Sequence, residues 1–146
     1  MYLFTFLVLL FINISCQKDT GCNEEGSIIP TETLPSSQTF ILKNIDDSKN
    51  ELTLIIRSQA DYEKFVHSNS TLPEIDFSRK FLIAVRVKLT SCGQTKDQSV
   101  VLQCNQLTYY AITQAHACHK PTDVFFFTII DIKYKDNLIQ FKISKT

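Results

Sequence analysis

KFLIAVRVKL, residues 80–89, is the stretch that decides the fold of this chain. One set of alternate positions is entirely apolar: Phe81, Ile83, Val85, Val87 and Leu89. Strict alternation over this length predicts a β-strand with one face in an apolar core. The other face starts with Leu82 and Ala84 and ends with Arg86 and Lys88, so we expect its far end to be solvated.

Six further segments have the alternation or the β-branched and aromatic composition of strands: 39–45, 51–57, 99–104, 107–113, 123–134 and 138–144. Turn-forming residues separate them. Asp46 to Asn50 predicts a turn between the first two, Asn105-Gln106 predicts a hairpin, and residues 135–137 predict a turn before the last strand. Connections this short predict antiparallel neighbours.

Only one segment has a helical pattern. Ser58 is a suitable N-cap, Asp61 lies in the first turn, and Tyr62, Phe65 and Val66 share one face. These residues predict a helix over 58–68, with His67 near its C-terminus. The expected fold class is therefore α+β and mainly antiparallel β, with about seven strands in a curved sheet or sandwich and one short helix near residues 58–68.

Composition is that of a globular domain, with 44% hydrophobic residues and a formal net charge of +0. No strong attraction to nucleic acid is expected at that charge. The chain through Asp76 has 11 acidic and 5 basic side chains, whereas the remainder has 4 acidic and 10 basic. Either the two halves complement each other across one fold, or a basic face meets lipid headgroups or an acidic partner.

The first sixteen residues, MYLFTFLVLLFINISC, form a short apolar segment that ends on a cysteine. This length suits a secretory signal and is too short for a membrane-spanning helix. Asn13-Ile14-Ser15-Cys16 resembles the lipobox of bacterial lipoproteins, which implies that Cys16 is acylated, with palmitate among the expected chains. We expect a signal peptide over 1–15, a polar tether over 16–38 and a single β-rich domain over 39–146.

Gln17-Lys18-Asp19, directly after the proposed acylation site, resembles the start of an export signal that places some lipoproteins on the cell surface. A solvated tether explains the same residues. The expected location is the bacterial outer membrane, with the protein lipid-anchored and either periplasmic or surface-exposed. The lipid bilayer is then one partner, reached through acylated Cys16.

Four cysteines remain once Cys16 is assigned to lipid: Cys22, Cys92, Cys104 and Cys118. Export places them in an oxidising compartment, where disulfides persist. Three pairings are possible, and sequence alone does not choose between them. We favour Cys92–Cys118, which leaves Cys22–Cys104.

A second resemblance covers roughly residues 52–130. SQADYEKFV (58–66), PEIDFS (73–78) and the strand FLIAVRV (81–87) are similar to the PrcB-like C-terminal domain, a family of small exported domains associated with a protease complex. The resemblance implies a binding or accessory role. That family has no catalytic residues to transfer to this chain.

Reactive residue types cluster at His116, Cys118 and His119. Imidazole and thiolate are ligands for zinc or copper, so these residues are candidate metal ligands. A disulfide at Cys118 would remove its thiolate. No nucleophile elbow, phosphate-binding loop or dinucleotide motif is present, and no cofactor is expected.

The leading functional hypothesis is a membrane-tethered, non-enzymatic binding or accessory module of the cell envelope with a protein partner. The alternatives are a metal-handling lipoprotein using His116, Cys118 and His119, and an envelope hydrolase with an unrecognised site. The run Phe125-Phe126-Phe127 forms strand core or, where it faces outward, marks a partner surface.

Overall fold

The computed structural model describes Cys22 and residues 24–146. The expected signal peptide and Cys16 lie outside the described residues. The elements are β1 (Ser27–Ile28), β2 (Glu32–Thr33), β3 (Phe40–Leu42), β4 (Glu51–Ile56), α1 (Gln59–Phe65), β5 (Val66–Ser68), β6 (Lys80–Leu89), β7 (Cys92–Gln103), β8 (Gln106–His116), β9 (Thr122–Asp131), the 3-10 helix η1 (Ile132–Tyr134) and β10 (Leu138–Lys145). The expected mainly antiparallel β fold with one short α-helix is confirmed.

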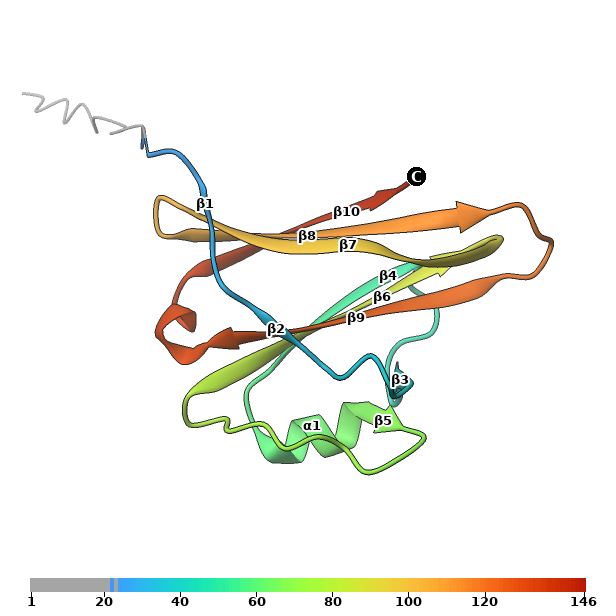
Figure 1. The fold of residues 1–146 in the computed structure, drawn as a ribbon, viewed down its shortest axis with the longest axis horizontal. Helices are drawn as coiled ribbons and strands as arrows, with labels where there is room; N and C mark the ends of the chain where they lie inside the picture. The colour runs from blue at the N-terminus through green and yellow to red at the C-terminus, as the bar shows by residue number, and fades with distance from the viewer. Residues whose placement is uncertain (1–21, 23) are drawn as a thin grey trace, which may run out of the picture.

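Two four-stranded sheets pack face to face as a sandwich (Figure 1). We call the sheet β1-β7-β8-β10 the outer sheet and the sheet β2-β9-β6-β4 the central sheet. α1 and the small β3-β5 sheet cover the far face of the central sheet. The central sheet therefore has apolar layers on both faces.

β6 lies between β9 and β4 in the central sheet. Its Phe81, Ile83, Val85, Val87 and Leu89 pack towards the outer sheet, in one cluster with residues such as Val100, Leu107 and Tyr109. Its Leu82 and Ala84 pack on the other side, with Tyr62 and Val66. Burial on both faces explains why the strand is apolar at nearly every position.

Arg86 lies on that second face and is 0% exposed, so the expected solvation of this end of the strand is wrong. The loop between β3 and β4 encloses it. The guanidinium donates to the Asp47 carboxylate at 2.6 Å and to the carbonyl oxygens of Asp46 at 3.0 Å and Lys49 at 2.7 Å. These charge-assisted hydrogen bonds offset the cost of removing the guanidinium from water.

The uneven charge of the sequence is balanced within the fold. Three ion pairs join a basic residue of the second half to an acidic residue of the first: Lys80–Glu32, Arg86–Asp47 and Lys145–Glu51. Of the two readings left open by the sequence, complementation across one fold is the one that these contacts support.

α1 begins as expected and ends early. The Ser58 hydroxyl accepts a hydrogen bond from the Asp61 backbone N–H at 3.1 Å and so caps the helix. The helix ends at Phe65 because residues 66–68 form β5 and pair with β3. The predicted helix over 58–68 is therefore too long, and His67 lies in a strand opposite Ile41.

β7 and β8 form the expected hairpin, although both strands are longer than predicted and β7 begins at Cys92. The two turn residues are Cys104 and Asn105, with φ of 52° and 63°. The turn is thus one residue earlier than the predicted Asn105-Gln106. Positive φ at both positions gives the twist that two-residue hairpins need.

The C-terminal strand differs from the prediction. β9 ends at Asp131, and residues 132–134 form η1 instead of continuing the strand. The chain then crosses to the outer sheet, where β10 pairs with β8 in parallel, with Leu138 opposite Gln106. The expected antiparallel hairpin with the preceding strand is therefore wrong, because η1 and the turn after it carry the chain from one sheet to the other.

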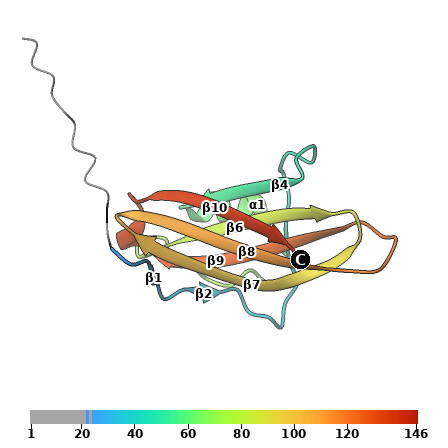
Figure 2. The ribbon, with the colours of Figure 1, turned by 90° about the horizontal axis from the view of Figure 1, so that it is seen from above.

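Part of the expected tether is folded. Ser27 and Ile28 pair with β7, and Glu32 and Thr33 pair with β9, so the sheets include residues well before Thr39. This segment passes from the outer sheet to the central sheet along one side of the sandwich (Figure 2).

Candidate binding cleft

One side of the sandwich has incompletely paired strands. β1 pairs only with residues 101–102 of β7, and β2 pairs only with residues 128–129 of β9. Within the described residues, no strand pairs with the outward edge of β7 over 92–99 or of β9 over 122–127. Pro35 follows β2 closely and has no N–H to donate, which is consistent with the early end of that strand.

A cleft of about 450 Å³ lies at this open side. One wall is the segment 33–38 with Phe40, the other is residues 95–98 of β7, and residues 125–127 of β9 form the floor. β2, the loop after it, β7 and β9 are seen along the same side of the molecule in Figure 2. Three segments distant in sequence thus form one concave site.

The β7 wall contains a β-bulge. Thr95 pairs with Thr113, but the next paired residue is Asp97, opposite Ile112, which leaves Lys96 as the extra residue. A bulge redirects side chains and is common beside functional sites. Lys96 and Asp97 bring one positive and one negative charge to the rim, and the Asp97 carboxylate accepts the Gln98 backbone N–H at 2.8 Å.

A buried hydrogen-bond network fixes the side chain of Gln98. Its Oε1 accepts from the Tyr109 hydroxyl at 2.9 Å and from the Thr128 hydroxyl at 2.8 Å. Tyr109 and Thr128 are completely buried. Burial raises the pKa of Tyr109 to about 12. No hydrogen bond within the described residues uses the Gln98 amide nitrogen, which is thus available as a donor.

Gln38 on the opposite wall provides the complementary group. Its Oε1 is enclosed and has no hydrogen-bond partner among the described residues. An enclosed acceptor without a partner costs about 1–3 kcal/mol. Gln38 also lines the cleft, so a turn of its side chain would bring this acceptor to a bound molecule that carries an N–H or O–H group.

The floor of the cleft is aromatic. Phe125 is half-buried and its ring stacks with that of Phe127, with centroids 6.4 Å apart. Phe127 in turn contacts Phe40 edge-on, at 6.0 Å. Phe126 points between the two sheets and is 2% exposed. Phe126 and Phe127 are therefore core, as one reading of the triple phenylalanine expected, and Phe125 is partly accessible beside the cleft.

The cleft has the composition of a binding site. Its hydroxyl groups come from Thr33, Ser36 and Thr95, and its lining includes no histidine or cysteine. Within the described residues, no hydrogen bond joins one of these hydroxyls to Lys96 or Asp97. An activated nucleophile needs a base within hydrogen-bond reach, and this geometry does not provide one.

A second hollow of about 650 Å³ lies near the start of β9 and the end of β10. Lys88 and Lys145 line it, but each is engaged. Lys88 donates to the Asp47 carbonyl, and Lys145 forms an ion pair with Glu51 at 3.0 Å. The first cleft, with its unused polar groups, is the stronger candidate.

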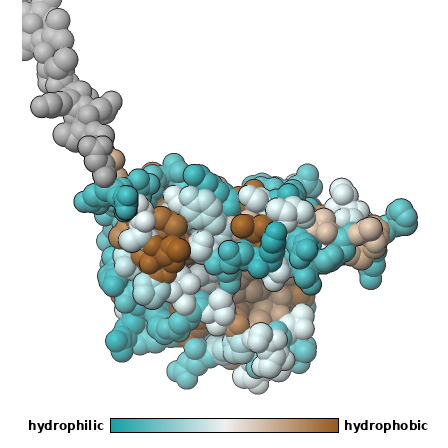
Figure 3. Space-filling view, turned by 45° about the horizontal axis from the view of Figure 1, so that its top comes forward, coloured by the Kyte–Doolittle hydropathy of each residue, from teal (hydrophilic) through white to brown (hydrophobic). Residues whose placement is uncertain are grey.

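Exposed apolar side chains do not offer a competing surface. Ile28 is 75% exposed on β1 and Leu138 is 67% exposed on β10, at opposite edges of the outer sheet. Figure 3 shows two compact apolar patches on the upper part of one face and a broader, paler apolar area below them. Scattered single apolar residues are ordinary on protein surfaces.

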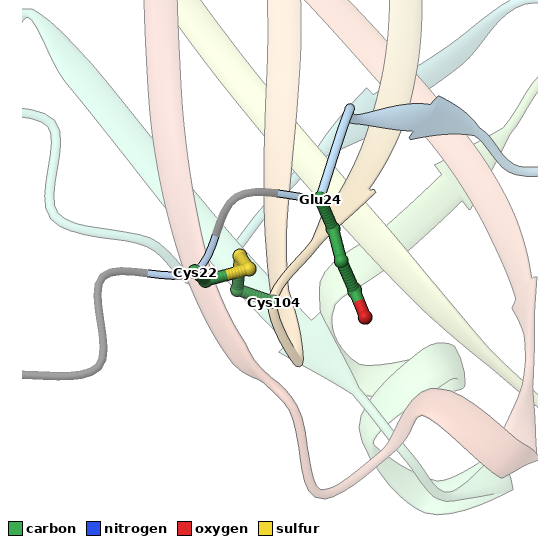
Figure 4. Close-up of side chains that lie close together, drawn as sticks. All are labelled: Cys22, Glu24 and Cys104. Carbon is green, nitrogen blue, oxygen red and sulfur yellow. A yellow bond between two sulfur atoms is a disulfide. The ribbon is translucent and has the colours of Figure 1, made fainter.

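The four candidate cysteines form two disulfides, Cys22–Cys104 and Cys92–Cys118, with Cα atoms 5.7 Å and 5.5 Å apart. This is the pairing that we favoured from the sequence. Cys22 and Cys104 lie beside Glu24, with their possible ligand atoms within 4.8 Å (Figure 4). Because the two sulfurs are bonded to each other, they are not thiolate ligands.

The His116, Cys118 and His119 cluster does not gather into a metal site. Cys118 is bonded to Cys92, so its thiolate is removed. His116 ends β8 opposite Cys92, and His119 lies in the following loop. The disulfide joins the start of β7 to the loop between β8 and β9.

Gln38 and Gln98 were not identified from the sequence. The strand predicted over 99–104 begins one residue too late to include Gln98. The sequence does contain a signal for Gln98. Gln98, Val100 and Leu102 occupy alternate positions of β7 that face inward, and Gln98 is the polar residue among them. Gln38 lies in an irregular loop and has no comparable signal.

No helix among the described residues is long and apolar enough to cross a membrane. No family model, curated protein or solved structure matches the chain. The likeness to the PrcB-like C-terminal domain and the lipobox at Cys16 therefore stay predictions from the sequence.

Proposed function

We propose that this protein is a non-enzymatic binding module of the bacterial cell envelope that holds a partner protein in the cleft between β7 and the β2–β3 segment. The observation that carries the proposal is a cleft in which Gln38, whose Oε1 has no hydrogen-bond partner among the described residues, and Gln98 line the walls beside the phenylalanines of β9. Such a combination of apolar surface and a few placed polar groups is typical of ligand sites.

The proposal includes attachment to the outer membrane through acylated Cys16. Five residues lie between Cys16 and Cys22, and the six steps of chain that join the two cysteines reach at most about 20 Å when extended. Cys22 is bonded to Cys104 in the β7–β8 turn. The tether would therefore hold that turn near the bilayer and leave the cleft on the flank of the domain accessible to a partner.

Site-specific photo-crosslinking in living cells tests the function. A photoreactive residue in place of Ser36, on the cleft wall, is expected to form a covalent adduct with another envelope protein. The control position is Lys142, which is exposed on β10 of the outer sheet. Adducts absent at Ser36, or equally abundant at Lys142, contradict the proposal.

A further inference from the structure

The open edge of β9 lies at the cleft floor. Residues 122–127 pair with β6 on one side only, within the described residues. Every second residue of an antiparallel strand directs its N–H and C=O towards the same neighbour, so this edge presents a row of backbone donors and acceptors. Unpaired strand edges are templates for another strand.

Other strands at this side and at the far edge of the outer sheet have features that discourage pairing. β10 carries Lys142 and Lys145, and β7 is bulged at Lys96. Charged residues and bulges are common protections of sheet edges. The β9 stretch 122–127 reads TDVFFF and contains no lysine, proline, glycine or bulge; its one charged residue is Asp123, at the end far from β2. Its edge is therefore suited to accept a strand.

β2 already uses the same edge. It pairs antiparallel with Ile129 and Thr128, and its last paired residue is Thr33. The pairing between β2 and β9 thus ends beside the cleft, and residues 122–127 of β9 have no strand partner on that edge within the described residues. A strand added there would continue an existing pairing and would be about 20 Å long.

We propose that the cleft binds an extended peptide segment of a partner protein, which adds to β9 as a strand beside residues 122–127. This inference rests on the proposed function. The peptide backbone pairs with the β9 edge, a peptide N–H or side-chain donor reaches Gln38 Oε1, and an acceptor receives the Gln98 amide. Alternate apolar side chains of the peptide pack on Phe125.

A second copy of this chain does not suit the site. The β9 edge lies between the wall at 33–38 and the bulged wall at 95–98. The same walls flank β9 in any other copy, so two such edges would be kept apart by their own walls. A single extended segment meets no such obstacle.

Selection from a random dodecapeptide library displayed on phage, with the full-length disulfide-bonded protein as target, tests the inference. We expect enriched sequences with apolar residues at alternate positions. In the synthetic peptide, N-methylation of one alternate set of amides should weaken binding by about tenfold or more, and N-methylation of the other set should have little effect. Equal effects of the two sets, or no enriched peptide, overturn the proposal.

Matched variants locate the binding edge. Phe125→Lys is expected to weaken peptide binding by about tenfold, and Gln38→Leu should weaken it as well. Ile55→Lys is the control, because Ile55 is 40% exposed on β4, the opposite edge of the same sheet. Equal loss in Phe125→Lys and Ile55→Lys contradicts the assignment to β9. A dimer that Phe125→Lys converts to a monomer would identify a second copy as the occupant instead.

The two proposals fail separately. Crosslinking at Ser36 without any selected peptide would support the proposed binding function but contradict the strand-addition mechanism. Absence of both the cellular adduct and the selected peptide would remove both proposals.

Discussion

Arg86 is the charged side chain that the fold encloses completely, and the β3–β4 loop depends on it. Arg86→Met preserves much of the side-chain volume but removes the hydrogen bonds to Asp47 and to the carbonyls of Asp46 and Lys49. The free energy of unfolding is expected to fall by about 2–3 kcal/mol. Guanidinium denaturation at pH 7 measures it.

The matched variant is Asp47→Asn. The Asp47 side chain is 82% exposed, and the carbonyl contacts of Arg86 persist without its charge. The loss should be about 1 kcal/mol or less. Losses as large as that of Arg86→Met would show that the ion pair, and not the enclosed guanidinium, holds the loop.

Tyr62 and Tyr109 make stability sensitive to alkaline pH. Burial raises the pKa of each to about 12, from the ordinary tyrosine value of 10.0. Above pH 10 the unfolded chain loses these protons while the folded chain retains them, so stability is fully present below pH 10 and is lost as pH rises towards 12. Each tyrosine contributes a slope of about 1.4 kcal/mol per pH unit.

Denaturation curves collected from pH 9 to pH 12 measure this slope. Tyr62→Phe and Tyr109→Phe should each reduce the slope by about 1.4 kcal/mol per pH unit. A slope unchanged in both variants contradicts the assignment. Tyr109→Phe should also weaken binding in the cleft, since its hydroxyl helps to fix Gln98.

Residues whose roles follow from covalent chemistry were predictable, and those whose roles follow from long-range packing were not. The prediction that Cys16 carries lipid left four cysteines and so predicted two disulfides, and both disulfides are present. The burial of Arg86 was missed because alternation reports the face of a strand but not which loop covers it. The cleft needed three distant segments to meet, which no local pattern encodes.

Among the elements, the β7–β8 turn is the most sensitive to backbone conformation. Asn105 has a φ of 63°, which a β-branched residue adopts only at a cost. Asn105→Val is expected to lower the free energy of unfolding by about 1–3 kcal/mol. Urea denaturation followed by circular dichroism is the measurement.

Asn105→Gly provides the comparison, because glycine adopts positive φ without strain. It loses the hydrogen bond between the Asn137 amide and Asn105 Oδ1 but keeps the one to the Asn105 carbonyl. Stability within about 0.5 kcal/mol of the parent is expected. Equal destabilisation by valine and glycine would assign the effect to the lost side chain instead of the backbone.

Elements with strong periodicity were predicted well. β6 has the predicted bounds, and α1 has its predicted N-cap. Errors occur where tertiary pairing decides, as at residues 66–68, which leave the helix pattern to pair with β3. The parallel pairing of β10 with β8 was missed because a short connection can cross between sheets as well as turn within one.

At the scale of the whole molecule, the two disulfides should contribute unequally. Cys22–Cys104 spans 82 residues of sequence and Cys92–Cys118 spans 26. On a chain-entropy estimate, their closed loops are worth about 4.5 and about 3.5 kcal/mol. The double serine variant of the first pair should therefore unfold at lower denaturant than that of the second. The reverse order would show that strain or residual structure outweighs loop length.

The Cys22–Cys104 disulfide also determines where a pulling force on the N-terminal chain acts on the domain. A pulling force on the chain before Cys22 is transmitted through the disulfide to Cys104 in the β7–β8 turn. The hydrogen bonds between β7 and β8, which pair from Cys92 to Gln103, then resist that force in shear. Without the bridge, the same pull would peel β1 and β2, which have two paired residues each. Peeling would carry away the wall at 33–38 and open the cleft. With the membrane anchor and the bound partner that we propose, the bridge would keep tension in the anchor from reaching the binding cleft.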